Sequence, residues 1–314
     1  MTFGFVFPGQ GSQSVGMLAG LAPAAGAESA IRDTFAEASA VLGYDLRQLV
    51  AHGPAERLNA TECTQPAMLA GSVATWRVWL GCGAAEPSVV CGHSLGEFSA
   101  LVAAGALDFA AAIDLVRFRG RLMQEAVPEG TGAMAAILGL DDAQVIEACR
   151  EGAQGGVVEA VNFNAPGQVV IAGAREPVQR AIEAAKARGA KRAVALPVSV
   201  PSHSNLMAPA ARRLGERLAT VEFRPPRLRF VSAVDARAHQ DPADLRQLLV
   251  RQLSSPVRWA QTVRGLAADG IGALIECGPG KVLTALNRRI ERSLQAVALE
   301  DADSLAAALD AVKA

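Results

Sequence analysis

The pattern of apolar and polar positions divides the chain into short buried strands and amphipathic helices. Phe3 to Phe7 is an apolar run that ends in Pro8-Gly9, which is typical of a buried strand that leads into a loop. Ser88 to Cys91 is a second such run, and a turn separates it from a helix predicted from Ser94 to about Ala104. The pattern further predicts helices over Glu28–Leu42, Pro66–Leu80, Asp108–Ala126, Ser204–Leu218, Asp241–Leu253 and Arg258–Asp269, a strand over Gly272–Cys277, and a last helix after Gly278-Pro279-Gly280. Strands that alternate with helices favour a parallel sheet covered on both faces.

The pattern changes between Gly130 and Pro197. The predicted elements there are a strand (Ala133–Gly139), a helix (Asp141–Gly152), two strands around Asn164-Ala165-Pro166-Gly167, a helix (Glu176–Arg188) and a strand (Arg192–Leu196). This β-α-β-β-α-β order is that of a ferredoxin-like domain. We therefore expect an α/β protein in two parts, a discontinuous large domain of residues 1–129 and 198–314 and an inserted small domain of residues 130–197.

Composition and charge restrict the class of protein. The chain has 314 residues, of which 51% are hydrophobic and 19% are charged, so it can bury a large core. Its formal net charge of −1 gives no electrostatic basis for binding nucleic acid or an anionic membrane. The most apolar long window, Ser88 to Leu107, contains His93 and Glu97 and is a poor membrane span. Met1 to Pro8 lacks the features of a secretion signal, so we expect a cytoplasmic protein.

The cysteines and histidines do not predict a metal site. The five cysteines are scattered, without a Cys-x-x-Cys pair or a zinc-type spacing to histidine, and reduced thiols fit them best. His93 and Glu97 are four residues apart and could share a helical face as metal ligands, but no third ligand is evident. We expect these two residues to shape a turn, and we expect no metal and no cofactor.

A nucleophile motif lies between the strand at Ser88–Cys91 and the helix that follows it. Gly92-His93-Ser94-Leu95-Gly96 is a Gly-x-Ser-x-Gly sequence, in which a sharp strand-to-helix turn exposes the serine at the edge of the sheet. The helix N-terminus and the amide of Leu95 would stabilise a developing oxyanion. The motif can also arise by chance in a chain with 30 glycines, but its flanking elements favour an acyl-transfer serine at Ser94.

Arg119 lies on the apolar side of its predicted helix. Its neighbours three, four and seven residues away are Leu115, Val116, Leu122, Met123 and Ala126. A buried guanidinium needs an anion, and arginine binds a carboxylate through two parallel hydrogen bonds. The sequence leaves open whether Arg119 binds a carboxylate of the acyl group, forms an internal ion pair or extends its head into water.

Only four histidines are available as the base that a serine nucleophile requires. His203, in the turn Val200-Pro201-Ser202-His203-Ser204 before a predicted helix, is the best candidate, with helix capping or a surface position as the alternative. No acid in a recognisable motif completes a triad. Gln10, in the glycine-rich loop after the first strand, is a candidate for a second oxyanion donor, although a simple turn also explains that loop.

Taken together, the motifs resemble the malonyl-CoA:acyl-carrier-protein transacylases of fatty acid synthesis. The resemblance extends over nearly the whole chain, and it rests on Phe7 to Gln13, Thr64-Gln65-Pro66-Ala67, Gly92 to Ala100, Arg119-Gly120, Val161 to Gln168, Pro201-Ser202-His203 and Glu276 to Gly280. One departure is Phe98, where the family commonly has tyrosine.

The resemblance implies a role for each of seven residues. Ser94 would be the nucleophile, His203 the general base, Arg119 the partner of the malonyl carboxylate, and the amides of Gln10 and Leu95 the oxyanion hole. The backbone carbonyl of Gln252 would orient the histidine in place of an acid, and Gln65 would line the same pocket. The implied fold is an α/β-hydrolase-like large domain with a mostly parallel sheet and a ferredoxin-like insertion, with the active site between them.

The implied reaction transfers malonyl from coenzyme A to the phosphopantetheine thiol of an acyl carrier protein through an ester on Ser94, in a protein expected to be monomeric. The same residues would also suit the malonyl-loading acyltransferase of malonate decarboxylase or of polyketide synthesis. A serine esterase or thioesterase would instead pass the acyl group to water, and a noncatalytic carrier-binding module would have no need of Ser94, His203 and Arg119 together.

Overall fold

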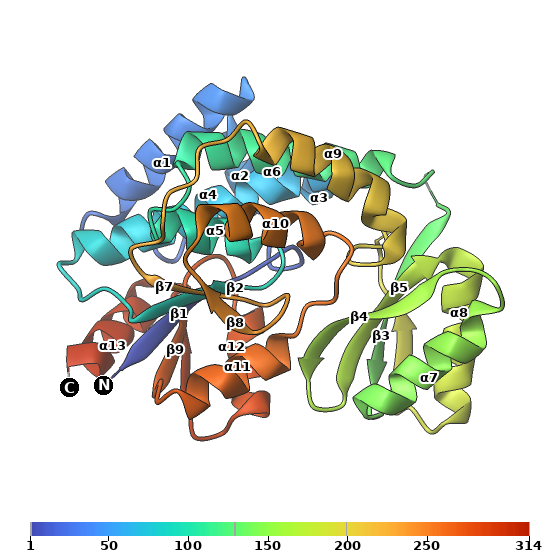
Figure 1. The fold of residues 1–314 in the computed structure, drawn as a ribbon. Helices are drawn as coiled ribbons and strands as arrows, with labels where there is room; N and C mark the ends of the chain where they lie inside the picture. Colours follow the sequence, from blue (N-terminus) through green and yellow to red (C-terminus); the bar gives the residue numbers. More distant parts are fainter. Residues whose placement is uncertain (1, 129, 199, 314) are drawn as a thin grey trace.

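The computed structural model describes residues 2–128, 130–198 and 200–313 of the chain. Met1, Glu129, Ser199 and Ala314 belong to the ranges expected for the two domains but lie outside the described residues. The described chain forms two β-sheets with helices packed on them (Figure 1). In this part of the chain no helix has the length and apolarity needed to cross a membrane.

The first sheet has six strands in the order β10-β9-β1-β2-β7-β8. They are β1 (Phe3–Phe7), β2 (Val89–Gly92), β7 (Arg229–Ser232), β8 (Arg237–His239), β9 (Ala273–Glu276) and β10 (Gln295–Ala298). All neighbouring strands are parallel except β7 and β8. The predicted mostly parallel sheet is therefore confirmed. The sequence pattern does not predict β7, β8 and β10, because strands of three or four residues with polar ends carry too little periodicity and form by pairing with their neighbours.

Both faces of this sheet are covered, because successive side chains of β1 point to opposite faces and all of them are buried. Phe5 and Phe7 point into one hydrophobic core, whereas Val6 belongs to a second core on the opposite face. The helices of this part are α1 (Ala27–Leu42), α2 (Leu46–His52), α3 (Ala55–Asn59), α4 (Thr61–Gly81), α5 (Gly96–Ala103), α6 (Phe109–Glu125), α9 (Ala208–Leu218), α10 (Pro242–Gln252), α11 (Trp259–Ala268), α12 (Val282–Ile290) and α13 (Ala302–Lys313). In Figure 1, α4, α5 and α10 lie on one side of the sheet, and α11 and α12 lie on the other.

The helices α4, α5 and α9 begin at other residues than predicted, and the largest difference is at α4. The sequence pattern predicts a helix that begins at Pro66, whereas α4 begins at Thr61 and contains Pro66 in its interior. Pro66 is the sixth residue of α4 and has no N–H group to donate to Glu62 O, so the helix lacks one hydrogen bond of its backbone ladder there. The earlier start matters for function, since it places Gln65 on a buried helical turn.

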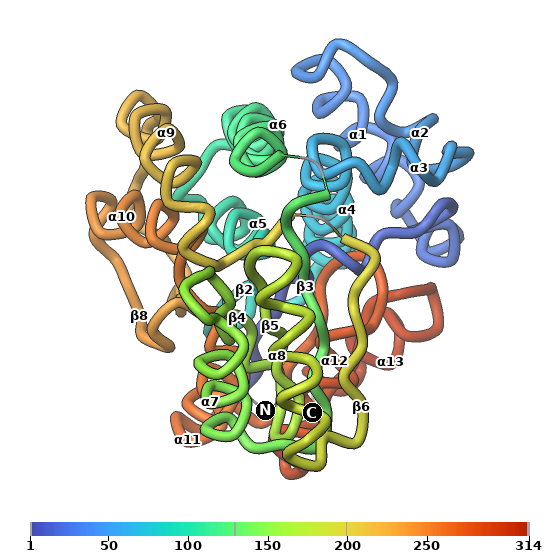
Figure 2. Tube along the Cα trace, turned by 90° about the vertical axis from the view of Figure 1, so that its right-hand side faces the viewer, coloured from blue at the N-terminus to red at the C-terminus, as the bar shows by residue number. Residues whose placement is uncertain are grey.

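The second sheet has the strand order β4-β5-β3-β6 and is antiparallel throughout. Its elements are β3 (Gly132–Leu138), α7 (Asp142–Ala153), β4 (Val158–Ala165), β5 (Gln168–Ala174), α8 (Arg175–Ala187) and β6 (Arg192–Ala195), which is the predicted order. Helices α7 and α8 pack on one face (Figure 2). The edge strand β4 is tied to the large part of the molecule, because Phe163 N donates to Val257 O at 2.9 Å and Val257 N donates to Val161 O at 2.8 Å.

Candidate active site

The nucleophile motif forms the turn between β2 and α5. Ser94 has a φ of 52°, a left-handed conformation that is uncommon for a residue with a side chain. The turn lies so close to its surroundings that a Cβ on Gly92 would come within 2.0 Å of Gly96 C, and one on Gly96 within 2.0 Å of Phe7 O. The two glycines are therefore required by close backbone approach. They allow the strained turn to hold Ser94 beyond the carboxyl end of β2.

A methyl group at Gly96 should consequently disrupt the turn. We expect Gly96→Ala to destabilise the protein by about 3 kcal/mol or more, because the atoms that it would meet belong to the backbone of β1 and cannot move aside. Gly265→Ala in α11 is the matched control, since a Cβ there meets nothing within 4 Å. Urea unfolding monitored by circular dichroism measures both changes. Equal stability of the two variants would contradict the packing argument.

His203 lies within hydrogen-bonding distance of the serine. Ser94 Oγ and His203 Nε2 are 2.7 Å apart, and His203 Nδ1 is 2.7 Å from the backbone oxygen of Gln252. A carbonyl oxygen can only accept, so it places the imidazole proton on Nδ1 and leaves Nε2 free to take the serine proton. Burial, together with the Arg119 cation, lowers the pKa of His203 to about 3, so the imidazole is neutral near pH 7.

Arg119 projects from α6 into the same site. Its side chain is 1% exposed, and its hydrogen-bond partners are neutral: Nη1 donates to Gln65 Oε1 at 2.9 Å, and Nη2 donates to Gln252 Oε1 at 3.0 Å and to Ser94 Oγ at 3.5 Å. Burial lowers the pKa of Arg119 to about 10, which still leaves it protonated at neutral pH. The site thus holds a buried cation with amide partners beside the serine hydroxyl. Such a cation favours an anionic ligand.

The loop after β1 lies against the nucleophile turn. His93 N donates to Phe7 O at 3.0 Å, and a Cβ on Gly9 would lie 2.6 Å from His93 O. Gln10 follows in this loop, and its side chain accepts from Gln65 Nε2 at 3.3 Å. Leu95 directly precedes α5, so its amide is at the positive end of that helix. The structure therefore places all seven candidate residues in one region.

The structure adds two polar residues that the sequence analysis did not assign to the site. Asn164 of β4 accepts from His93 Nε2 at 2.8 Å, which links the second sheet to the nucleophile turn. Glu97 is 1% exposed and accepts three hydrogen bonds beneath the site. The available signal for Glu97 was a charged residue in an otherwise apolar helical segment, whereas β4 contains several polar residues and no comparable signal distinguished Asn164. In the described part of the chain, His93 and Glu97 belong to no cluster of three or more metal-binding side chains.

A cavity of about 480 Å³ adjoins the histidine. Residues from α7 and β4 line one wall and residues 254–258 line the other, with His203 at the boundary between them. His203 therefore lies at the junction of the two parts of the molecule. A substrate that reached His203 from this side would contact both parts of the molecule.

Comparison with known proteins places this chain among acyltransferases. Residues 4–307 match the family model of the acyl transferase domain. The chain is 57% identical over 307 residues to the malonyl CoA-acyl carrier protein transacylase of Salmonella typhimurium, covering 98% of both chains, and 43% identical to that of Bacillus subtilis, covering 98% and 96%.

Two solved structures are closely similar. An acyl carrier protein S-malonyltransferase from Vibrio cholerae superposes with a TM-score of 0.95 at 56% identity, covering 98% of this chain and 100% of that one. A malonyl-transacylase described in complex with its type II PKS acyl-carrier protein superposes with a TM-score of 0.97 at 56% identity, covering 99% and 100%.

Proposed function

This chain belongs to the acyl transferase family, among the malonyl CoA-acyl carrier protein transacylases. From this premise we propose that Ser94 carries the malonyl group from the thiol of coenzyme A to the thiol of the carrier protein. The observation that carries the proposal is the pairing of Ser94 and His203 at 2.7 Å beside the buried Arg119, whose partners are neutral amides. The first pair supplies a nucleophile and a base, and the cation supplies a site for a carboxylate on the acyl group.

In the first half-reaction, Ser94 Oγ attacks the thioester carbon of malonyl-CoA while His203 Nε2 takes the hydroxyl proton. The carbonyl oxygen becomes an oxyanion, which the amides of Leu95 and Gln10 stabilise. The C–S bond then breaks, and the departing thiolate of coenzyme A takes the proton from His203. The product is a malonyl ester on Ser94, with its distal carboxylate on Arg119.

In the second half-reaction, the phosphopantetheine thiol of the carrier protein gives its proton to His203 and attacks the ester carbon. The C–O bond to Ser94 breaks, and Oγ recovers its proton from the imidazole. The Gln252 carbonyl holds Nδ1–H throughout, so Nε2 faces the reacting atoms in both halves. His203 carries every proton transfer and the amides of the same chain stabilise the oxyanion, so we propose a monomer that needs no other reactant than its two substrates.

Mass spectrometry of the intact protein tests this cycle. Mixing with malonyl-CoA should add the mass of one malonyl group, and subsequent addition of holo-acyl carrier protein should remove it and produce malonyl-carrier protein. The ester should persist for many turnover times when no thiol acceptor is present. Rapid release of free malonate without the carrier would instead identify an esterase or thioesterase.

The pathway served by the product is a further part of the proposal. We propose that the malonyl-carrier protein formed here supplies fatty acid synthesis. The similarity to a malonyl-transacylase that binds a type II PKS acyl-carrier protein supports a polyketide carrier as a second possible acceptor. Parallel transfer assays with carriers of the two kinds would rank them by kcat/KM.

We also propose a finer description of the fold. The strand order β4-β5-β3-β6, with α7 and α8 on one face, supports a ferredoxin-like small domain within residues 130–197. The strand–Ser94–helix turn on a mostly parallel sheet supports an α/β-hydrolase-like large domain made of residues 1–129 and 198–314. The cavity beside His203 supports an active site between these two domains.

A further inference from the structure

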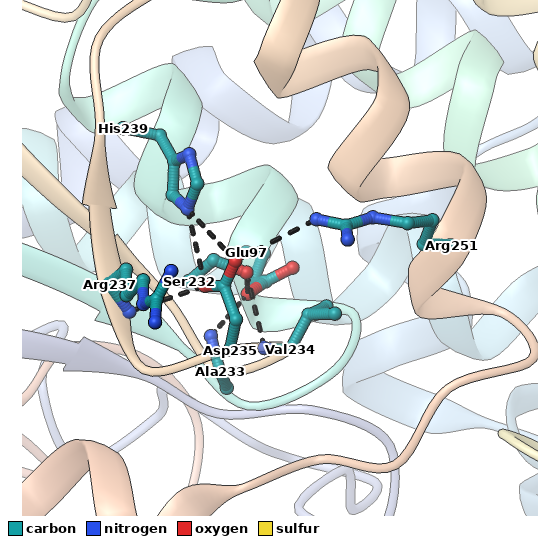
Figure 3. A network of polar contacts seen from close by, with 8 residues as sticks. All are labelled: Glu97, Ser232, Ala233, Val234, Asp235, Arg237, His239 and Arg251. Atoms are coloured by element: carbon teal, nitrogen blue, oxygen red, sulfur yellow. Dashed lines mark hydrogen bonds and ion pairs between the residues drawn. The ribbon is translucent and has the colours of Figure 1, made fainter.

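Glu97 is a buried carboxylate directly beneath the reactive groups. It lies in the first turn of α5, three residues after Ser94, and is 1% exposed. One of its oxygens accepts from Ser232 Oγ at 2.7 Å and from Ala233 N at 2.6 Å, as Figure 3 shows, and the other accepts from Gln252 Nε2. All three partners donate to it. This set suits the ionised carboxylate, which can only accept.

The Gln252 side chain connects this carboxylate to Arg119. Its Nε2 donates to Glu97 and to the backbone oxygen of Ser94 at 2.9 Å, while its Oε1 accepts from Arg119 Nη2 at 3.0 Å. The reversed amide would place N–H groups against the guanidinium and its oxygen against two acceptors. Glu97 therefore acts together with Ser94 O and Arg119 to favour the orientation in which Gln252 presents its oxygen to Arg119.

Glu97 also acts on Arg119 through its charge. Burial lowers the pKa of Arg119, and the field of the Glu97 carboxylate opposes this effect. The two groups are joined through the Gln252 amide. A direct ion pair would occupy the guanidinium with a carboxylate of the protein, whereas a neutral amide partner still leaves the cation in need of an anion. The arrangement keeps Arg119 charged and held in place while leaving the anion to come from the substrate.

The segment from Ser232 to Asp235 contacts both Glu97 and the end of α10. Ser232 and Ala233 bind Glu97, and Asp235 in the same segment lies 3.7 Å from Arg251 Nη2 and 3.2 Å from His239 Nε2 (Figure 3). Arg251 precedes Gln252 at the end of α10. The same segment therefore binds the carboxylate directly and contacts the helix end that carries the amide through a partly exposed ion pair.

We propose that Glu97 is a positioning residue for malonyl recognition, which orients the Gln252 amide and thereby aims the Arg119 guanidinium at the carboxylate of the acyl group. The inference rests on the proposed function of Arg119. It concerns selectivity between acyl groups, because an acetyl group has no carboxylate for Arg119 to bind.

Glu97→Gln tests this role with little change of volume. The new amide would turn N–H groups toward the N–H groups of Gln252 and so weaken the preference for the observed orientation of that side chain. We expect KM for malonyl-CoA to rise about 10- to 100-fold, the effect of losing one charge-assisted hydrogen bond. The rate of acylation by acetyl-CoA should change about threefold or less, because the acetyl group has no carboxylate that binds Arg119. Assays at pH 8 keep the carboxylate ionised, since burial raises the pKa of Glu97 to about 7.

Two further variants separate positioning from stability. Glu276→Gln removes another fully buried carboxylate, which accepts from the amides of Leu283 and Thr284, and should cost stability without changing the malonyl-to-acetyl ratio. Ser232→Ala removes one donor to Glu97 and should shift that ratio in the direction of Glu97→Gln, by about fivefold. Ser232→Ala also provides the test if Glu97→Gln does not fold.

The possible outcomes are distinct. An unchanged malonyl-to-acetyl ratio would overturn the proposal. Tighter malonyl binding would also overturn it, because it would show that the Glu97 charge chiefly repels the substrate. The wild-type protein, assayed in parallel, reports on the proposed function itself. Failure of the wild-type chain to form the malonyl ester would reject that function, whereas an unchanged ratio in the variants would reject only the role of Glu97.

Discussion

Replacing Ser94 by alanine should lower malonyl transfer to the carrier protein by at least about 10⁴-fold, because no other hydroxyl can occupy the strained turn beside His203. The structure should tolerate the change. Alanine keeps the Cβ at a φ of 52° and loses only the hydroxyl, whose partners are His203 Nε2 and Arg119 Nη2.

Two measurements check this expectation together. The rate of malonyl-carrier formation gives the loss of activity, and the intact mass after incubation with malonyl-CoA should show no added malonyl group. Binding of malonyl-CoA to Ser94→Ala by calorimetry is the control, since Arg119 and the surrounding amides remain in place. A variant that still acquired the malonyl mass would place the nucleophile elsewhere.

Replacing Arg119 by alanine should lower kcat/KM for malonyl-CoA by about 10²- to 10³-fold, the effect of removing one member of a buried charge pair. The physical reason is the burial of the guanidinium, which is 1% exposed and bound to neutral amides, so that a substrate carboxylate becomes its charged partner. The rate with acetyl-CoA should fall by about fivefold or less, the effect of one ordinary hydrogen bond.

Arg117→Ala is the matched control for this experiment. Arg117 lies on the same helix but is partly exposed, donates to the backbone oxygen of Leu42 and lies 3.6 Å from Asp114. It should leave the ratio of malonyl to acetyl transfer unchanged. Arg119→Lys should recover only part of the lost malonyl activity, because an ammonium group cannot bind a carboxylate through two parallel hydrogen bonds. An equal fold-loss of kcat/KM for malonyl-CoA and acetyl-CoA in Arg119→Ala would show that Arg119 has only a structural role.

Much of the fold could be predicted from periodicity. The continuous apolar run from Phe3 to Phe7 predicts a buried strand, and the structure confirms it. The order of elements in the second sheet was likewise predictable, because its two helices and the strands β3, β4 and β5, of seven or eight residues each, are long enough to show a periodicity, although β6 has only four residues. The short strands β7, β8 and β10 were not, since they are stabilised by pairing with distant segments.

The candidate site divides in a similar way. Local sequence indicated the Ser94 turn through its two flanking glycines, and helical periodicity indicated that Arg119 faces an apolar environment. Neither pattern could decide between an internal ion pair and a ligand for that arginine. The structure surrounds it with the side-chain oxygens of Gln65 and Gln252, which come from helices far apart in the sequence.

The sequence by itself therefore determined the features that depend on backbone sterics and on periodicity over a few residues: the tight turn at Ser94, the buried strands and the apolar side of α6. Only the tertiary structure decided which side chains meet. Ser94 and His203 are 109 residues apart and Glu97 and Gln252 are 155 apart, so their hydrogen bonds exist because the packing of helices on the sheet brings these segments together. The orientation of the buried Gln252 amide could not be predicted from the sequence either, because it depends on every donor and acceptor around it.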